Sequence, residues 1–193
     1  MIDYNSVYQK DYFQSRPQLD DINNRGHYYE YSKWLVKNFE FQTVLDVGCG
    51  YSSLLFGLNA HGKRVTGVDI SQWLVDHLRG LHPEIEYIRD GLPGLYSLGL
   101  RKFDIVFCNQ VLEHIHKADI PNALSRLLEV TDKWLMLSIA MGDMAKKDPT
   151  HITIKPREWW IEKLARLGEL ETELSYCKSE EEFIVKKGKV DDD

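Results

Sequence analysis

The sequence predicts an α/β protein with a single doubly wound, mostly parallel seven-stranded sheet and an antiparallel C-terminal hairpin. Short apolar runs alternate with helical segments from residue 43 to residue 168. This alternation is typical of a parallel sheet that is covered by helices on both faces. Two late segments, residues 169–177 and 180–188, resemble the strands of a hairpin. A length of 193 residues suits one domain.

Each expected element has its own local signal. The helix at 72–81 follows Ser71, whose hydroxyl can accept an amide of the first helical turn. Glycines and a proline in residues 91–102 predict a loop with at most a short helix. The other helices are identified by apolar periodicity and the strands by short apolar runs. We expect strands at 43–47, 64–70, 85–90, 103–109 and 133–140, and further helices at 27–39, 52–62, 117–131 and 156–168.

Composition excludes several classes of protein. The net charge of −6 argues against a partner that presents a phosphate backbone, so we expect no nucleic acid. Three cysteines far apart in sequence give neither a disulfide framework nor a zinc pattern. The polar first residues do not resemble a secretory signal, and no apolar run is long enough to span a bilayer. We therefore expect a cytoplasmic monomer or homodimer without a membrane partner.

The stretch VLDVGCGYSS, residues 44–53, predicts a nucleoside site. Glycines at 48 and 50 allow a tight turn and let a ligand approach the main chain. Asp69 ends the next strand about 20 residues later, where a carboxylate can accept both ribose hydroxyls. Asp90 ends the third strand and could accept from an adenine amino group. In such sheets ligands bind beyond the carboxyl ends of the strands.

Two features of the glycine loop favour S-adenosylmethionine over a dinucleotide. Ser53 stands at the third glycine position of the dinucleotide fingerprint, which weakens the close approach of a pyrophosphate. Asp46 lies next to the loop, where an anion repels a pyrophosphate but attracts an ammonium group. S-adenosylmethionine has an ammonium group and no phosphate.

At this point the chain resembles the class I S-adenosylmethionine-dependent methyltransferases of the small-molecule type, from about Phe41 to its end. VLDVGCG is similar to their first motif, and VTGVDIS to the strand whose acid holds the ribose. FDIVFCNQVLEHI is similar to their fourth strand and its exit. HITIKPREWWIEKLARLG resembles a late segment in which a histidine precedes a helix. The resemblance implies the Rossmann-like methyltransferase fold.

The resemblance also implies a set of cofactor-binding residues. Asp46 would hold the methionine ammonium group, Asp69 the ribose and Asp90 the adenine amino group. The cofactor would be S-adenosylmethionine and the product S-adenosylhomocysteine. The remaining residues implied to contact the cofactor are Gly48, Cys49, Gly50, Ile70, Gly91, Asn109 and Gln110.

The acceptor side is less defined. His151 follows the fifth strand and is the candidate catalytic base, with a hydrogen-bonded scaffold role as the alternative. Glu113 and His114 would line the acceptor pocket or orient the loop after the fourth strand. Glu113, His114 and His116 together would suit a metal, but with no further ligands nearby we expect none.

The N-terminal segment is expected to be a helical lid of residues 1–40, followed by an S-adenosylmethionine-binding domain of residues 41–193. Plain packing of a helix on the sheet is the alternative. Tyr12 and Tyr28 are candidate substrate contacts in the lid, and Arg157 would suit an anionic acceptor.

The sequence thus predicts methyl transfer to an oxygen or nitrogen of a small-molecule acceptor by in-line displacement. Two alternatives stay open. One is a non-catalytic partner protein that binds S-adenosylmethionine. The other is an NAD-dependent oxidoreductase, which the absent third glycine and the short chain disfavour.

Overall fold

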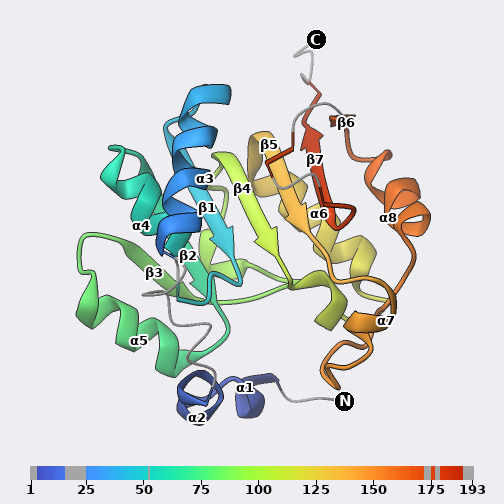
Figure 1. Ribbon diagram of the computed structural model, residues 1–193, viewed down its shortest axis with the longest axis horizontal. Helices are drawn as coiled ribbons and strands as arrows, with labels where there is room; N and C mark the ends of the chain where they lie inside the picture. Colours follow the sequence, from blue (N-terminus) through green and yellow to red (C-terminus); the bar gives the residue numbers. More distant parts are fainter. Residues whose placement is uncertain (1–3, 16–24, 52, 172–174, 177–178, 189–193) are drawn as a thin grey trace. The chain divides into compact units, whose positions relative to one another are not determined.

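The computed structural model describes residues 4–15, 25–51, 53–171, 175–176 and 179–188 (Figure 1). Seven strands form one sheet in the order β3-β2-β1-β4-β5-β7-β6, which confirms the expected fold class. The chain forms two compact units, residues 1–91 and residues 92–193. The expected boundary between a lid and a domain at residue 40 stays a prediction.

Unit 1 contains three parallel strands, β1 (Thr43–Val47), β2 (Arg64–Asp69) and β3 (Glu86–Arg89). Asp46 pairs with Gly67 in the register of β1 and β2, and Asp69 pairs with Arg89 in that of β2 and β3. Asp46 and Asp69 therefore lie at the carboxyl ends of β1 and β2, where the sequence places the ligand.

The helices of unit 1 are α1 (Tyr4–Val7), α2 (Lys10–Gln14), α3 (Arg25–Asn38), α4 (Ser53–Ala60) and α5 (Gln72–Leu81). Helix α3 packs closely on α4 at Gly57. A Cβ added at this glycine would lie only 2.7 Å from the Ser32 hydroxyl oxygen, so only glycine fits there without a shift of Ser32. Helix α5 begins as expected, since Ser71 Oγ accepts the amide of Leu74 at 3.2 Å.

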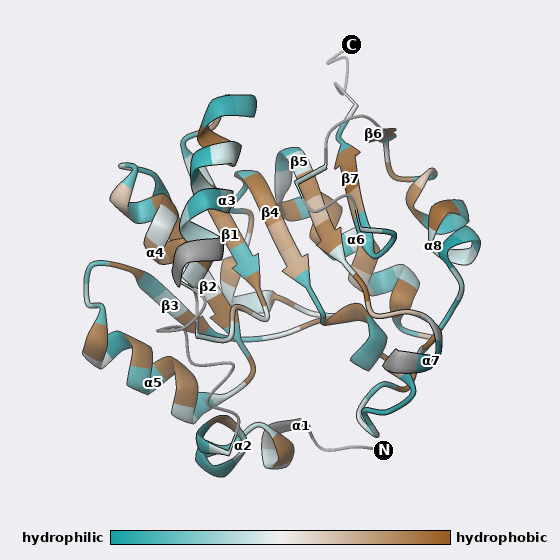
Figure 2. Ribbon diagram, in the orientation of Figure 1, coloured by the Kyte–Doolittle hydropathy of each residue, from teal (hydrophilic) through white to brown (hydrophobic). Residues whose placement is uncertain are grey.

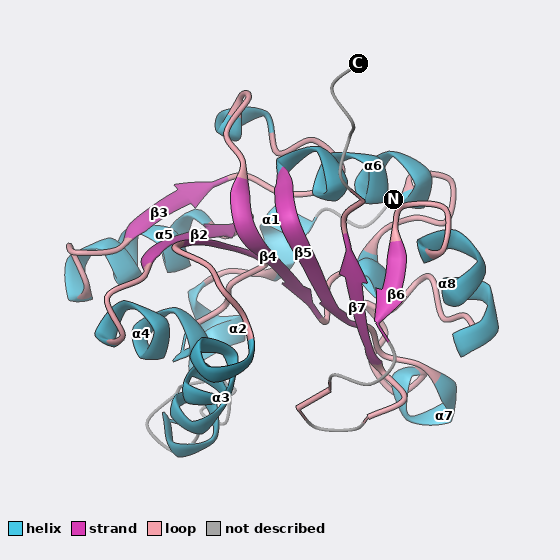
Figure 3. Ribbon diagram, turned by 90° about the horizontal axis from the view of Figure 1, so that it is seen from above, coloured by secondary structure: helices cyan, strands magenta, loops and turns pink. Residues whose placement is uncertain are grey.

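Unit 2 contains β4 (Phe103–Asn109) and β5 (Thr131–Ser138), which are parallel, and β7 (Glu182–Lys186) and β6 (Glu169–Glu171), which are antiparallel. Figure 3 shows β6 beside β7, the expected C-terminal hairpin. The helices are α6 (Ile120–Val130), α7 (Gly142–Ala145) and α8 (Arg157–Leu164). Single 3₁₀ turns lie at η1 (Tyr96–Leu98) and η2 (Leu112–His114).

Some expected boundaries in unit 2 are wrong by two to four residues. Helix α6 begins at Ile120, three residues later than expected, with Pro121 in its first turn, a position that suits proline. The helix ends where the hydroxyl of Thr131 donates to the Leu127 carbonyl, and β5 starts at Thr131 itself. Helix α8 ends at Leu164, because the Leu167 amide turns back to the Leu164 carbonyl instead of continuing the helix.

Hydropathy follows the elements. Figure 2 shows β4 as almost wholly hydrophobic, whereas α5 alternates hydrophobic and hydrophilic residues. Four consecutive residues of β4, from Ile105 to Cys108, are completely buried. Such a continuous apolar run is typical of a strand that is covered on both faces. A search of the described helices finds none with the length and apolar character needed to span a bilayer.

Candidate functional site

The glycine loop of unit 1 follows β1 and turns sharply. Gly48 and Gly50 both have left-handed backbones, with φ of +74° and +51°. The amides of Gly48 and Cys49 both donate to the carbonyl of Val68, at 2.7 and 3.0 Å. The loop is therefore attached to the end of β2. A Cβ at Gly50 would meet no atom within 4 Å, so the main chain there can be approached closely.

Asp69 joins this loop to the start of α5. Its carboxylate accepts the amide of Ser71 at 2.9 Å and the amide of Gly50 at 3.2 Å. The side chain is buried, and burial raises the pKa of its carboxyl group although these amides oppose the shift. The position expected for the ribose acid is thus occupied by a buried carboxylate with a fixed orientation.

Asp46 is a second buried acid, with 6% of its surface exposed. Burial, followed by repulsion from Asp69, raises the pKa of its carboxyl group to about 7. A carboxyl group in this state gains stability from a neighbouring cation, because a cation favours the ionised form. The buried carboxyl group of Asp46 therefore suits a positively charged ligand group.

The third strand of unit 1 contributes a short polar segment. The Asp90 amide donates to the Asp69 carbonyl at 3.1 Å, and the Asp90 carboxylate accepts the Gly91 amide at 2.7 Å. A Cβ at Gly91 would lie 3.6 Å from Cβ of Ile70. The structure thus brings Asp69, Ile70, Asp90 and Gly91 together, while their contacts with adenosine stay predictions.

An aromatic cluster in unit 1 was missed by the sequence analysis. Phe13 of α2 stacks on Trp73 of α5 with ring centroids 5.8 Å apart, and lies edge-on to Tyr51 at 5.5 Å. Tyr12 lies beside Phe13 at 5.2 Å, whereas Tyr28 belongs to α3. Helix α2 therefore packs next to the glycine loop. The sequence signal for this cluster is Phe13, an aromatic residue in a polar segment. In the structure the Phe13 side chain is only 5% exposed.

In unit 2, Asn109 ends β4 opposite Ser138 of β5. Gln110 has a left-handed backbone with φ of +55°. Its amide donates to the Ser138 carbonyl at 2.7 Å, and its side-chain nitrogen donates to the Ser138 hydroxyl at 2.8 Å. These bonds fix the backbone where β4 ends. The expectation that Asn109 and Gln110 lie near the cofactor sulfonium stays a prediction.

Glu113 is completely buried in the turn that follows. Its Oε1 accepts the amide of Ala140 at 3.2 Å, while its Oε2 has no hydrogen-bond partner among the described residues. The Glu113 carbonyl accepts the amides of Ile152 and Thr153, both at 2.9 Å. Burial raises the pKa of the Glu113 carboxyl group. The turn after β4 and the segment after α7 are therefore bonded to each other at this residue.

His114 and His151 lie next to Glu113, with their rings edge-to-face and centroids 4.6 Å apart. Nδ1 of His114 lies 3.1 Å from the Thr150 carbonyl, and Nδ1 of His151 lies 2.8 Å from the Ala145 carbonyl. A carbonyl can only accept, so each Nδ1 carries the proton and each Nε2 the lone pair. Burial, with the nearby His151, lowers the pKa of His114.

One ligand atom from each of Glu113, His114 and His151 lies within 4.8 Å of the other two. The structure thus brings together three residues that the sequence placed at the acceptor site. Among the described residues, the group contains His151 and not His116. The combination of Glu113, His114 and His116 that the sequence suggested as metal ligands is therefore wrong.

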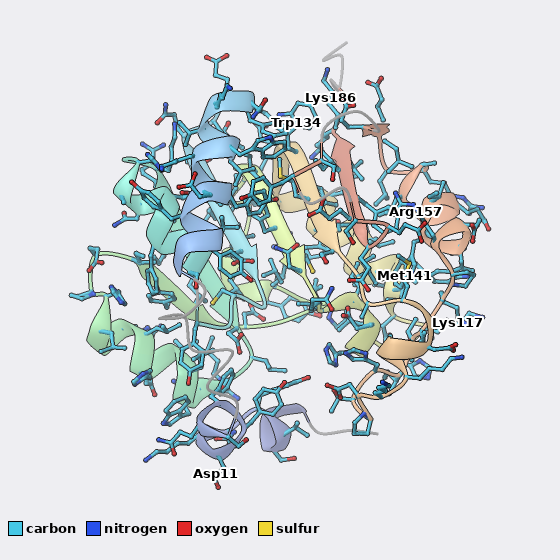
Figure 4. The ribbon with its side chains drawn as sticks, viewed as in Figure 1. Asp11, Lys117, Trp134, Met141, Arg157 and Lys186 are labelled. Carbon is cyan, nitrogen blue, oxygen red and sulfur yellow. The ribbon has the colours of Figure 1, made fainter. Side chains whose placement is uncertain are left out.

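Arg157 at the start of α8 faces β7 (Figure 4). Its guanidinium donates to the backbone carbonyls of Glu180 and Glu182 and lies over the Phe183 ring at 4.3 Å. These contacts attach α8 to the hairpin. The sequence could not reveal them, because backbone carbonyls leave no residue pattern; contact with the acceptor stays a prediction.

Part of the chain is similar to known methyltransferases. Residues 44–133 match the family described as "Methyltransferase domain". The chain is 28% identical over 109 residues to a ubiquinone biosynthesis O-methyltransferase of Nitrosomonas europaea, covering 54% of this chain and 46% of that protein. It is 38% identical over 76 residues to the corresponding Coxiella burnetii protein, covering 37% and 32%. The chain thus spans less than half the length of these relatives.

Among solved structures, magnesium protoporphyrin IX methyltransferase from Synechocystis PCC 6803 with bound S-adenosylhomocysteine aligns with a TM-score of 0.72. The alignment covers 95% of this chain and 96% of that chain at 20% sequence identity, a likeness of fold. The family match begins within β1, runs through the glycine loop and Asp69, and ends in β5. The match covers just under half of the chain, so the chain is similar to the class I S-adenosylmethionine-dependent methyltransferases over residues 44–133 and in its fold.

Proposed function

We propose that the protein transfers a methyl group from S-adenosylmethionine to a hydroxyl oxygen of a small molecule. The observation that carries the proposal is the pair of buried acids at the glycine loop, Asp46 and Asp69. Two neighbouring buried carboxyl groups favour a ligand that brings a cation and hydroxyl donors. S-adenosylmethionine has both, in its ammonium group and its ribose. Oxygen as the accepting atom is supported by the names of the relatives, which are O-methyltransferases.

In this proposal unit 1 supplies the cofactor contacts. Asp69 accepts the ribose hydroxyls with its carboxylate, which the amides of Gly50 and Ser71 already orient. Asp46 becomes ionised when the ammonium group binds, since a cation lowers the pKa of a buried acid. Adenine lies along Ile70 and Gly91, with Asp90 as the acceptor for its amino group.

Unit 2 supplies the acceptor side. A hydroxyl is a weak nucleophile until its proton is removed. The Nε2 lone pair of His151 suits this task, because the Ala145 carbonyl fixes the tautomer in which Nε2 can accept. Glu113 and His114 lie within 4.8 Å of it and shape the same cluster.

The reaction is an in-line displacement. The acceptor oxygen forms a bond to the methyl carbon while the carbon–sulfur bond breaks, and its electron pair returns to sulfur. The products are the methyl ether and S-adenosylhomocysteine, and the hydroxyl proton passes to the acceptor-side cluster. The sulfonium already activates the methyl group, so the protein mainly aligns the two reactants, which can lower a barrier by about 7–11 kcal/mol.

Calorimetric titration of the purified protein with S-adenosylmethionine, S-adenosylhomocysteine and NAD tests the cofactor. We expect binding of the first two at micromolar concentrations and none of NAD. Binding of NAD alone would contradict the proposal. A labelled-methyl assay over phenols, catechols, sugars and amines then tests the accepting atom, and we expect label in ethers; label only in amines would exclude oxygen.

A further inference from the structure

We infer that Glu113, His114 and His151 form a binding site for one divalent transition-metal ion. One carboxylate oxygen and two imidazole nitrogens converge, with all three ligand atoms within 4.8 Å of one another. Two atoms bound to one ion through bonds of about 2.0–2.2 Å lie at most about 4.4 Å apart, so small side-chain adjustments complete the set.

The buried carboxylate is the second, independent observation. Glu113 is completely buried, and its Oε2 has no hydrogen-bond partner among the described residues. An unpaired carboxylate oxygen in the protein interior is costly, and a bound cation compensates for it. The other oxygen, Oε1, accepts the Ala140 amide, which fixes the orientation of the carboxylate.

Both histidines make a hydrogen bond that metal-bound histidines usually make. Such residues donate their second ring nitrogen to a carboxylate or a backbone carbonyl, which fixes the tautomer. Here the carbonyls of Thr150 and Ala145 accept from Nδ1 of His114 and His151, so the lone pair of each ring is on Nε2. From the sequence we expect no metal, because no further ligands lie near Glu113, His114 and His116 along the chain.

The two segments that carry the ligands are also held together. The amides of Ile152 and Thr153 donate to the Glu113 carbonyl at 2.9 Å, and the Thr153 hydroxyl donates to the Ile115 carbonyl at 2.7 Å. Thr153 is almost completely buried. These bonds fix the cluster without the ion, so the ligands are pre-organised.

The ligand set selects the kind of ion. Magnesium and calcium prefer oxygen ligands alone, whereas imidazole favours zinc, cobalt, nickel, copper and iron. Three protein ligands leave at least one position for water or substrate, as in catalytic sites. If the proposed function holds, a hydroxyl acceptor bound at this position would have its pKa lowered by the ion. In the loaded protein His151 is then a ligand instead of the base.

Metal binding can be tested without any methyl acceptor. The full chain is freed of metal with a chelator and titrated with Zn²⁺ and Mg²⁺ by calorimetry, and with Co²⁺ by visible absorption. We expect one equivalent of Zn²⁺, weaker binding of Mg²⁺, and a cobalt spectrum typical of nitrogen and oxygen ligands. Loss of a ligand should weaken Zn²⁺ binding at least about 100-fold, since loss of outer partners alone costs 10–100-fold.

Three variants make the test specific. Glu113→Gln keeps an acceptor for the Ala140 amide but loses the charge, and His151→Asn removes one imidazole; both should lose the tight equivalent. His116→Asn is the matched control, because His116 is an exposed histidine two residues from His114. Circular dichroism of the metal-free proteins checks folding.

The inference is wrong if the wild type binds no Zn²⁺, if both ligand variants bind like the wild type, or if His116→Asn loses binding equally. Tighter binding of Mg²⁺ than of Zn²⁺ would also contradict it. Titration of the same preparations with S-adenosylhomocysteine reports on the cofactor site alone. Failure of the metal site and failure of the proposed function are therefore distinguishable.

Discussion

Asp46 and Asp69 of unit 1 and Glu113 of unit 2 are all buried acids. Asp69 and Glu113 differ in the hydrogen bonds that their carboxyl groups accept. Asp69 accepts two backbone amides, and the glycine loop and α5 are organised around it. Glu113 accepts one amide and keeps an unpaired oxygen beside two histidines. The acids of unit 1 thus suit a ligand with a cation and hydroxyl groups, whereas the acid of unit 2 suits a metal or a proton. Burial of a carboxyl group alone does not define its function; its neighbours do.

The largest effect is expected for Asp69→Ala. Both ribose hydroxyls would lose a charged acceptor, each such bond contributing about 1.5–3 kcal/mol, so affinity for S-adenosylhomocysteine should fall at least about 100-fold. Calorimetric titration measures it. Asp76→Ala, which removes an exposed acid from α5, is the control and should bind like the wild type. Unchanged affinity in a folded Asp69→Ala protein would show that the two acids of unit 1 are not a ribose and ammonium site.

A smaller effect is expected from pH. Asp46 has an ordinary pKa of 3.8 when unfolded and about 7 when folded, so between these values the folded protein binds the extra proton. The free energy of unfolding of the cofactor-free protein should therefore fall as pH rises from about 4 to 7, by at most about 1.4 kcal/mol per pH unit from this group. Urea denaturation at several pH values measures the slope. Asp46→Asn should flatten it, and an unchanged slope in this variant would assign the dependence to other groups.

The sequence predicted unit 1 better than the cluster of Glu113, His114 and His151 in unit 2, for a physical reason. The signals around Asp46, Gly50 and Ser71 are local, since a tight turn requires glycine and a helix start favours serine. The cluster of Glu113 and His151 depends on how two loops meet, and periodicity contains no information about that. Their residue types identified them as candidates, but only the structure shows that they converge.

The same contrast explains the errors at element ends. Helix α5 was predicted with its observed bounds, because Ser71 marks its start through a side-chain bond. Helix α6 lacks such a bond at Asp119, and its start was predicted three residues too early. Phe13 was missed because its partners, Tyr51 and Trp73, belong to other segments of unit 1.

The smallest effect distinguishes these two helix starts. Ser71→Ala removes the hydroxyl that accepts the Leu74 amide and leaves that buried donor unpaired, so it should lower the free energy of unfolding by about 1 kcal/mol. Asp119→Ala removes no capping bond, and only the weaker attraction between an acid and the helix dipole, about 0.3–1 kcal/mol, is lost. Urea denaturation of both variants at one pH measures the difference. A Ser71→Ala protein as stable as the wild type would mean that the Ser71 hydroxyl does not stabilise α5. The helix would then be stabilised by packing of its buried face, Leu74, Val75 and Leu78, as α6 is by its own buried residues.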